Sequence, residues 1–326
     1  MMTILRYAAL TCLGIAINVT PLQAADDAAT YPSRQIRLVV GFTAGGGNDI
    51  IARVVGQKLS KSLGQPVIIE NKPGGGAVIA TEHVARATPD GYTLLVGASG
   101  AMAINPAVND KLNYDTLRDF VPVSTLGSFP LILVVKASSP YKTLADLTAF
   151  AKANPDKANY SSASPAFQLA AELFKQKTGT PMQMIPYKGT NDAVTAVIAG
   201  DVTTTIADAG PVMSQVTGGQ VRALAVAAPA RMAELPDVPT MKEAGADVEA
   251  VLWSGIFAPK GTPPAIVKKL QDEFMRIARM PDVISKLKTL SIESVGNSSD
   301  EFAKIIASDI ARWTEVARAG NIRLNP

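Results

Sequence analysis

Short apolar runs alternate with amphipathic stretches along almost the whole chain, and this alternation constrains the fold strongly. Residues 36–42 (IRLVVGF) form a continuous apolar run, as expected for a strand buried on both faces of a sheet. A glycine-rich turn follows. Ile51, Val55 and Leu59 then recur every four residues, which predicts a helix from about residue 48. Repeated strand, turn and helix are typical of α/β folds with parallel sheets.

The same plan continues toward the C-terminus. Further strands are expected at 66–71, 93–99, 131–135, 158–162, 182–187, 203–208, 222–228 and 251–259. Helices are expected from about residue 77 and at 143–153, 166–178, 190–200, 210–218, 263–279 and 299–319. The last helix carries an apolar stripe that consists of Phe302, Ile306, Ile310, Trp313 and Ala317.

The length of 326 residues allows two domains, each with its own core. Two extended apolar segments, near Gly127–Leu131 and Val251–Phe257, are suited to serve as paired hinge strands between them. We therefore assign residues 26–128 plus 254–326 to the first domain and 129–253 to the second.

The N-terminal residues 1–24 have the features of a cleaved secretory signal peptide. Arg6 is the only charge in the first 25 residues, the apolar stretch 7–17 follows, and Ala24 offers a small residue for cleavage. Lipidation at Cys12 and retention of the segment as an anchor are the alternatives. The apolar stretch is about half as long as the roughly 20 residues that a membrane span needs.

Composition excludes several classes of function. The chain has one Cys (Cys12) and one His (His83), so it cannot by itself build a Cys/His zinc site, an iron–sulfur cluster or a disulfide framework. The net charge is +3 without a run of Lys or Arg, which makes nucleic acid an unsuitable partner. We expect no metal and no cofactor.

The most distinctive local motif is the glycine-rich loop at 41–49 (GFTAGGGND), between a predicted strand and a predicted helix. Backbone N–H groups of such a loop, with the positive end of the helix dipole, form an anion site without Lys or Arg. The loop lacks the Gly-Lys-Ser/Thr of a phosphate-binding P-loop. It also lacks the third Gly of a dinucleotide fingerprint, since Ile50 takes that place. A tight turn capped by Asn48 or Asp49 is the alternative.

A second loop, 97–106 (GASGAMAINP), also follows a predicted strand. It resembles a G-x-S-x-G nucleophile elbow around Ser99, but Ala101 replaces the last Gly. The only histidine, His83, precedes Ser99, whereas α/β-hydrolases have the histidine after the nucleophile. A serine hydrolase of that type is therefore not predicted.

The predicted second domain carries similar loops. Residues 161–165 (SSASP) separate a strand from a helix, 186–190 (PYKGT) do the same, and Asp208 ends another strand. Ligands of open α/β sheets bind outside the carboxyl ends of the strands. Loops of both domains that face each other across a hinge would therefore line a cleft, although helix capping and ordinary turns explain the same residues.

Taken together, these motifs resemble the substrate-binding receptors of tripartite tricarboxylate transporters, the Bug or TctC-like family. The resemblance covers essentially the whole chain after the leader. It rests on the order and spacing of YPSRQIRLVVGFTAGGGND, IENKPGGGAVIATEHVARATPDGYTLLVG, AINP, PYKGTNDAVTAVIAGDV, GGQVRALAVAAPAR, LPDVPTMKEAG and WSGIFAPKGTP.

The resemblance implies a hinged, two-domain periplasmic binding protein fold (type II-like) with its ligand cleft between the domains. It implies a receptor that is not an enzyme, and that delivers a small organic carboxylate to membrane permease subunits. Nothing in the sequence suggests an obligate oligomer, so we expect a monomer. By motif, the ligand-binding residues are Phe42, Thr43, Ala44, Gly46, Asn48, Ser162, Ala163 and Ser164, with Ala98, Ser99, Met102, Tyr187 and Asp208 in secondary roles.

The chain departs from the usual family pattern in three places. Thr43 precedes Ala44 where a Pro is common, and Met102 stands where a His is frequent. The second-domain loop is short, and Phe167 follows it where the family has more polar material. The last two changes favour a carboxylate with an apolar or aromatic body, such as an aromatic dicarboxylate, over citrate or an amino acid.

Two alternative functions remain open from the sequence. The same fold could present its ligand to a sensor kinase, which the identity of a neighbouring gene would distinguish from a permease role. An α/β enzyme that acts on organic acids is the third class, and saturable turnover would identify it.

Overall fold

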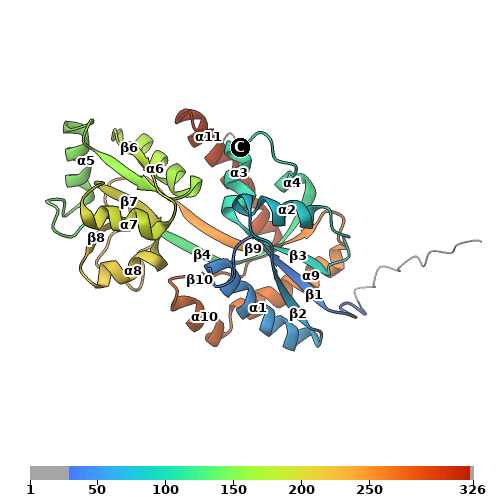
Figure 1. Cartoon of the computed structure of the whole chain (residues 1–326). Coiled ribbons are helices and arrows are strands. Elements are labelled where there is room, and N and C mark those ends of the chain that lie inside the picture. Colours follow the sequence, from blue (N-terminus) through green and yellow to red (C-terminus); the bar gives the residue numbers. More distant parts are fainter. Residues whose placement is uncertain (1–28, 324–326) are drawn as a thin grey trace, which may run out of the picture.

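The computed structural model describes residues 29–323, so the predicted leader at 1–24 lies outside the described residues. Two lobes lie side by side, and two long strands run between them (Figure 1). In the part of the chain that the structure describes, no helix has the length and apolar character that crossing a membrane requires.

The first lobe contains three parallel strands in the order β2-β1-β3. Its strands are β1 (Ile36–Val40), β2 (Val67–Asn71) and β3 (Thr93–Ala98), and its connecting helices are α1 (Gly47–Leu63) and α2 (Val78–Ala85). Shorter elements of this lobe are η1 (Gly75–Ala77), the π-helical turn η2 (Gly100–Ile104), α3 (Asn105–Val108) and α4 (Thr116–Asp119). Helix α1 ends because Gly64 adopts the left-handed conformation at φ 68°, where its N–H bonds to the Ser60 carbonyl.

The second lobe repeats the strand–helix plan. Its parallel strands are β5 (Asn159–Ser162), β6 (Gln183–Pro186) and β7 (Thr204–Asp208), with β8 (Val221–Val226) at the far side. Its helices are α5 (Leu144–Ala153), α6 (Pro165–Thr178), α7 (Thr190–Ala199) and α8 (Ala209–Thr217). Helix α5 starts with a capping box, in which Thr143 and Asp146 satisfy each other's backbone N–H groups.

The two lobes share strand β4 (Phe120–Lys136). Its first part pairs antiparallel with β9 (Val251–Pro259), up to the pair Pro130–Val251, and its last part pairs with β7 and β8. Strand β9 in turn lies antiparallel to β3. One strand therefore belongs to both sheets, and β4 with β9 forms the connection between the lobes (Figure 1).

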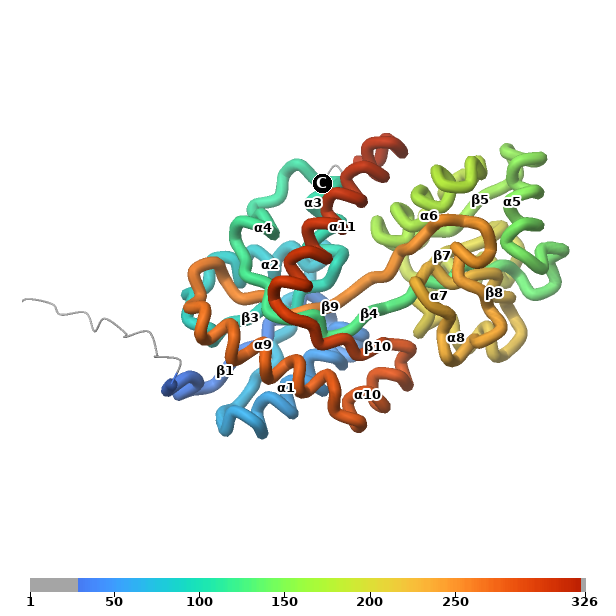
Figure 2. Tube along the Cα trace, turned by 180° about the vertical axis from the view of Figure 1, so that it is seen from behind, coloured from blue at the N-terminus to red at the C-terminus, as the bar shows by residue number. Residues whose placement is uncertain are grey.

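The C-terminal segment returns to the first lobe as α9 (Pro264–Ala278), α10 (Pro281–Lys288), β10 (Glu293–Ser294) and α11 (Ser299–Ala319). Helix α11 crosses the back of the molecule (Figure 2). Its buried stripe includes Phe302, Ile306 and Trp313, as the periodicity predicted. Near its end, the Val316 carbonyl accepts a hydrogen bond of 3.0 Å from Gln176 of α6, so the helix also touches the second lobe.

The expectation of parallel sheets is correct for each set of three strands but wrong for the centre, where β4, β8, β9 and β10 pair antiparallel. Strands buried on both faces have the same continuous apolar pattern in either direction, so the sequence did not distinguish them. Helices α4 and α10 and the first part of β4 were not predicted. The division into 26–128 plus 254–326 and 129–253 stays a prediction.

Candidate functional site

A cavity of about 670 Å³ lies between the two lobes, at the carboxyl ends of their parallel strands. Phe129 and Pro130 of β4 and Leu252 and Trp253 of β9 form its floor, on the two strands that connect the lobes. Its position agrees with the rule that open α/β sheets bind ligands outside the carboxyl ends of their strands.

The glycine-rich loop forms the first-lobe wall of this cavity. Gly45, Gly46, Gly47 and Asn48 line it where helix α1 begins. Gly46 is the N-cap and offers no side-chain cap. The first amides of an α-helix have no partner within the helix, and they carry the positive end of its dipole. The loop therefore presents backbone donors to the cavity.

Asp49 fixes the shape of this loop without lining the cavity itself. Its buried carboxylate accepts hydrogen bonds from the Gly45 N–H at 2.8 Å, from Arg53 Nε at 2.8 Å and from Asn71 Nδ2 at 2.9 Å. Burial raises the pKa of Asp49, but the hydrogen bonds from Arg53, Gly45 and Asn71 outweigh it and hold the pKa at about 2. The loop is thus fixed around a carboxylate that is ionised at neutral pH and does not line the cavity.

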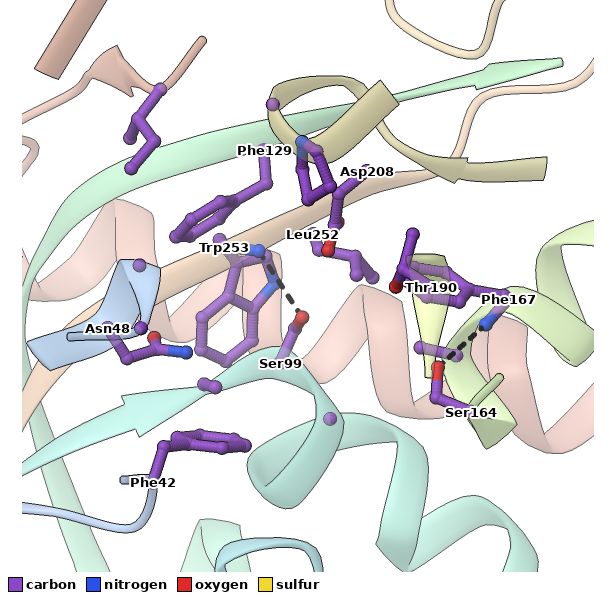
Figure 3. A pocket seen from close by; sticks show the side chains of 18 of the residues that line it. Phe42, Asn48, Ser99, Phe129, Ser164, Phe167, Thr190, Asp208, Leu252 and Trp253 are labelled. Carbon is purple, nitrogen blue, oxygen red and sulfur yellow. Dashed lines mark hydrogen bonds between the residues drawn. The ribbon is translucent and has the colours of Figure 1, made fainter. Parts of the chain in front are cut away.

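The turn after β3 forms the next part of the wall. Ala98, Ser99 and Gly100 line the cavity at the start of η2. The backbone N–H of Trp253 donates to Ser99 Oγ at 3.2 Å (Figure 3). Ser254 Oγ donates to Asn48 Oδ1 on the neighbouring loop. Strand β9 therefore fixes the orientation of both first-lobe loops.

Three helix starts of the second lobe face these loops. Helix α6 begins after Ser164, whose Oγ accepts from the Phe167 N–H at 3.4 Å. Helix α7 begins after Gly189, which provides no side-chain cap, and helix α8 begins after Asp208, whose side chain also does not cap it. All three starts line the cavity, so the N-termini of four α-helices converge on it.

The charges around the cavity are unusual. Within residues 29–323, no Lys, Arg or His lines it, and Asp208 is the only ionisable lining side chain. Burial raises the pKa of Asp208 to about 6, and its Oδ1 is buried without a hydrogen-bond partner. The favourable field for an anion therefore comes from helix N-termini and backbone N–H groups.

Large apolar side chains complete the walls. Phe42, Phe129, Phe167, Leu252 and Trp253 come from both lobes and from the connecting strands, and they surround the cavity (Figure 3). Four of the five are aromatic, and such rings bind flat apolar surfaces well. The described residues contain no group of three or more His, Cys, Asp or Glu that could hold a metal ion.

The structure brings together eight of the thirteen residues that the sequence singled out. Those that line the cavity are Phe42, Gly46, Asn48, Ala98, Ser99, Ala163, Ser164 and Asp208. They come from loops at the ends of four different strands. Their role as ligand-binding residues stays a prediction.

The other five residues do not line the cavity. Thr43 and Ala44 are exposed at the tip of their loop. Met102 is fully buried in the core, where η2 packs under β3. Ser162 Oγ turns back to donate to the Ser164 carbonyl at 3.0 Å, and Tyr187 packs against the apolar cluster of the second lobe. Met102 therefore adds no apolar surface to the cavity, whereas Phe167 does.

The sequence interpretation missed several lining residues. Four of them lay within the predicted hinge strands: Phe129, Pro130, Leu252 and Trp253. Two hinge strands that connect the walls of a cleft also form its floor, so the predicted strands could have identified these residues. Residues 289–292 gave no signal, because they follow helix α10, which was not predicted.

Comparisons with known proteins agree with this architecture. The model of the family described as tripartite tricarboxylate transporter family receptor matches residues 51–322. Protein BugT of Bordetella pertussis is 35% identical over 319 residues, which are 97% of this chain and 98% of BugT.

Two solved structures are similar along most of the chain. A Rhodopseudomonas palustris protein with adipate has a TM-score of 0.78 and 33% identity, over 90% of this chain and 99% of that one. MatC from the same organism, with bound malate, has a TM-score of 0.74 and 32% identity, over 88% and 99%. These matches confirm the α/β fold of periplasmic binding proteins and the family resemblance. The chain belongs to the TctC family of tripartite tricarboxylate transporter receptors.

Proposed function

We propose that this protein is a periplasmic receptor that captures a small organic carboxylate with an aromatic or apolar body, such as an aromatic dicarboxylate. It delivers this ligand unchanged to the membrane permease subunits of a tripartite tricarboxylate transporter. Membership of the receptor family supports a role in transport rather than catalysis. The predicted leader at 1–24 supports export to the periplasm.

One observation carries the carboxylate part of the proposal. Four α-helix N-termini from both lobes converge on one cavity that, among the described residues, has no cationic side chain. Backbone N–H groups at helix starts bind anions well, and they do so without a counter-charge that would attract any acid indiscriminately. The similar proteins with adipate and malate hold carboxylates as well.

The apolar walls of the cavity support the second part of the proposal, which is the aromatic or apolar body of the ligand. Phe42, Phe129 and Trp253 offer ring surface, Leu252 adds apolar area beside Trp253, and Phe167 adds it from the second lobe (Figure 3). A compact, highly hydrated ligand such as citrate would leave this surface uncovered, whereas a benzene ring or an alkyl chain would bury it.

A thermal-shift panel tests the ligand class. Terephthalate, benzoate and adipate are expected to raise the melting temperature, and citrate and glutamate to leave it unchanged. Native mass spectrometry of the protein as purified would detect a co-purified acid, and recovery of that acid unaltered after incubation tests the absence of turnover. Stabilisation by citrate or glutamate, with none by the acids that have an apolar body, would refute the proposed ligand class.

A pair of variants tests the first loop. Gly46 has an ordinary extended backbone (φ −78°, ψ 166°), and a Cβ there would meet only the Thr43 carbonyl, at 3.6 Å. Gly46→Asn and Gly46→Asp therefore add side chains of the same size and differ in charge. We expect Gly46→Asp to bind at least about tenfold more weakly than Gly46→Asn. Equal affinities in the two folded variants would remove this loop from the site.

A further inference from the structure

Among the residues that the structure describes, Asp208 is the one lining residue whose charge opposes the capture of an anion. It ends β7, pairs with Leu131 of β4 and occupies the N-cap of α8, and its carboxyl group points into the cavity beside Leu252 (Figure 3). An N-cap Asp normally accepts from the first amides of its helix, as Ser164 does at α6. Asp208 does not, so the first amides of α8 leave its carboxyl group without a hydrogen bond.

The described segments next to Asp208 provide no compensating charge. Strand β7 and helix α8 (AGPVMSQVT) contain no Lys, Arg or His, and neither does the paired segment of β4 from residue 129 to 135. The segment 289–292, which lines the cavity near α8, has no charged residue either. Burial alone raises the pKa of the carboxyl to about 6, and Oδ1 is buried without a partner.

Burying a carboxylate oxygen without a hydrogen-bond donor costs free energy. A hydrogen bond from a charged donor recovers more of that free energy than one from a neutral donor. The missing donor would come from the ligand. A second ligand carboxylate at the same place would meet a like charge instead, in a setting with little screening.

We propose that Asp208 is a specificity-determining residue that accepts a hydrogen bond from an N–H or O–H group of the ligand. The preferred ligand then has a carboxylate toward the loop Gly45–Asn48, an apolar body between the lobes and a donor, best a cationic amine, toward the Asp208 carboxyl group. This inference rests on the proposed function and narrows it, because a dianionic dicarboxylate is disfavoured at the Asp208 end.

Two matched pairs of ligands test the inference by isothermal titration at pH 8. 4-(Aminomethyl)benzoate and terephthalate differ at one end of an aromatic body, and 6-aminohexanoate and adipate differ at one end of an alkyl chain. In at least one series, wild-type protein is expected to bind the amino acid at least about tenfold more tightly than the dicarboxylate. Asp208→Asn, which keeps the shape and removes the charge, is expected to reduce that ratio at least about tenfold.

Asp192→Asn is the control, because Asp192 is an exposed acid in the first turn of α7 and does not line the cavity. It is expected to keep the wild-type ratio. If wild-type protein binds the dicarboxylates as tightly as the amino acids or more tightly, this inference is overturned and the proposed function stays intact. The same holds if the ratio is unchanged in Asp208→Asn. Failure of all four ligands to bind would overturn both. The wild-type ratio decides the matter even if Asp208→Asn does not fold.

Discussion

The buried carboxylate of Asp49 gives a prediction whose size follows from the structure. Its pKa falls from an ordinary value of 3.8 to about 2 on folding, which stabilises the native state by about 2 kcal/mol when the group is ionised. Because the folded-state pKa is the lower one, this contribution is complete above about pH 5. It decreases as the pH falls, to roughly half at pH 3, and little is left at pH 2.

Asp49→Asn tests this reasoning, since it keeps one acceptor oxygen and removes the charge that meets Arg53 and the Gly45 N–H. We expect a loss of about 2 kcal/mol in the free energy of unfolding at pH 7, measured by urea denaturation, and a gap between the two proteins that narrows steadily toward pH 2. Ligand affinity should fall too, because Gly45 lines the cavity.

The control for this experiment is Asp110→Asn. Asp110 is an exposed acid whose side chain is 83% accessible and forms a surface ion pair with Arg323 at 3.3 Å, so its replacement should leave the stability nearly unchanged. A gap between wild type and Asp49→Asn that stays constant from pH 7 to pH 2 would refute the electrostatic origin of the effect and point to packing instead.

Two further variants test other parts of the site. Gly210→Ala places a Cβ 2.7 Å from the Leu290 carbonyl, where α8 of the second lobe meets the first lobe, so it should weaken ligand binding by roughly 5- to 150-fold in calorimetry. Affinity equal to wild type would show that the Leu290 carbonyl moves away from the added Cβ at little cost. Trp253→Phe removes the 2.7 Å hydrogen bond from Nε1 to buried Asp309 and should lower the free energy of unfolding by about 1–3 kcal/mol in urea. A stability within error of wild type would indicate that Arg312 alone satisfies Asp309.

The sequence predicted most of the strands and helices, because their periodicity and their capping residues are local properties. The turn from β1 into α1 is an example: an apolar run, three glycines and a four-residue apolar repeat already specify it. The same local signals placed Gly46, Ser99 and Ser164 at strand ends, and the structure gathers them around one cavity.

Periodicity and capping residues did not predict the directions in which the side chains point. Met102 and Ser99 lie three residues apart in the same loop, yet the π-helical turn η2 directs Met102 into the core and leaves Ser99 on the cavity. Strand direction was also hidden, because β4 and β9 are apolar on both faces whichever way they run. Trp253 lay in a predicted strand, but only the pairing of β9 with β4 shows which cavity it faces.

The strand pair β4–β9 has a consequence for the kinetics of capture. Phe129 and Trp253 stand on the two strands that connect the lobes, so a rotation of the lobes about this strand pair would change their positions least. The apolar body of a ligand would then dock first on a surface that exists before closure. The helix starts of the two lobes would engage its polar ends only afterwards, so substitutions on the axis should alter the association rate and substitutions at the helix starts the residence time.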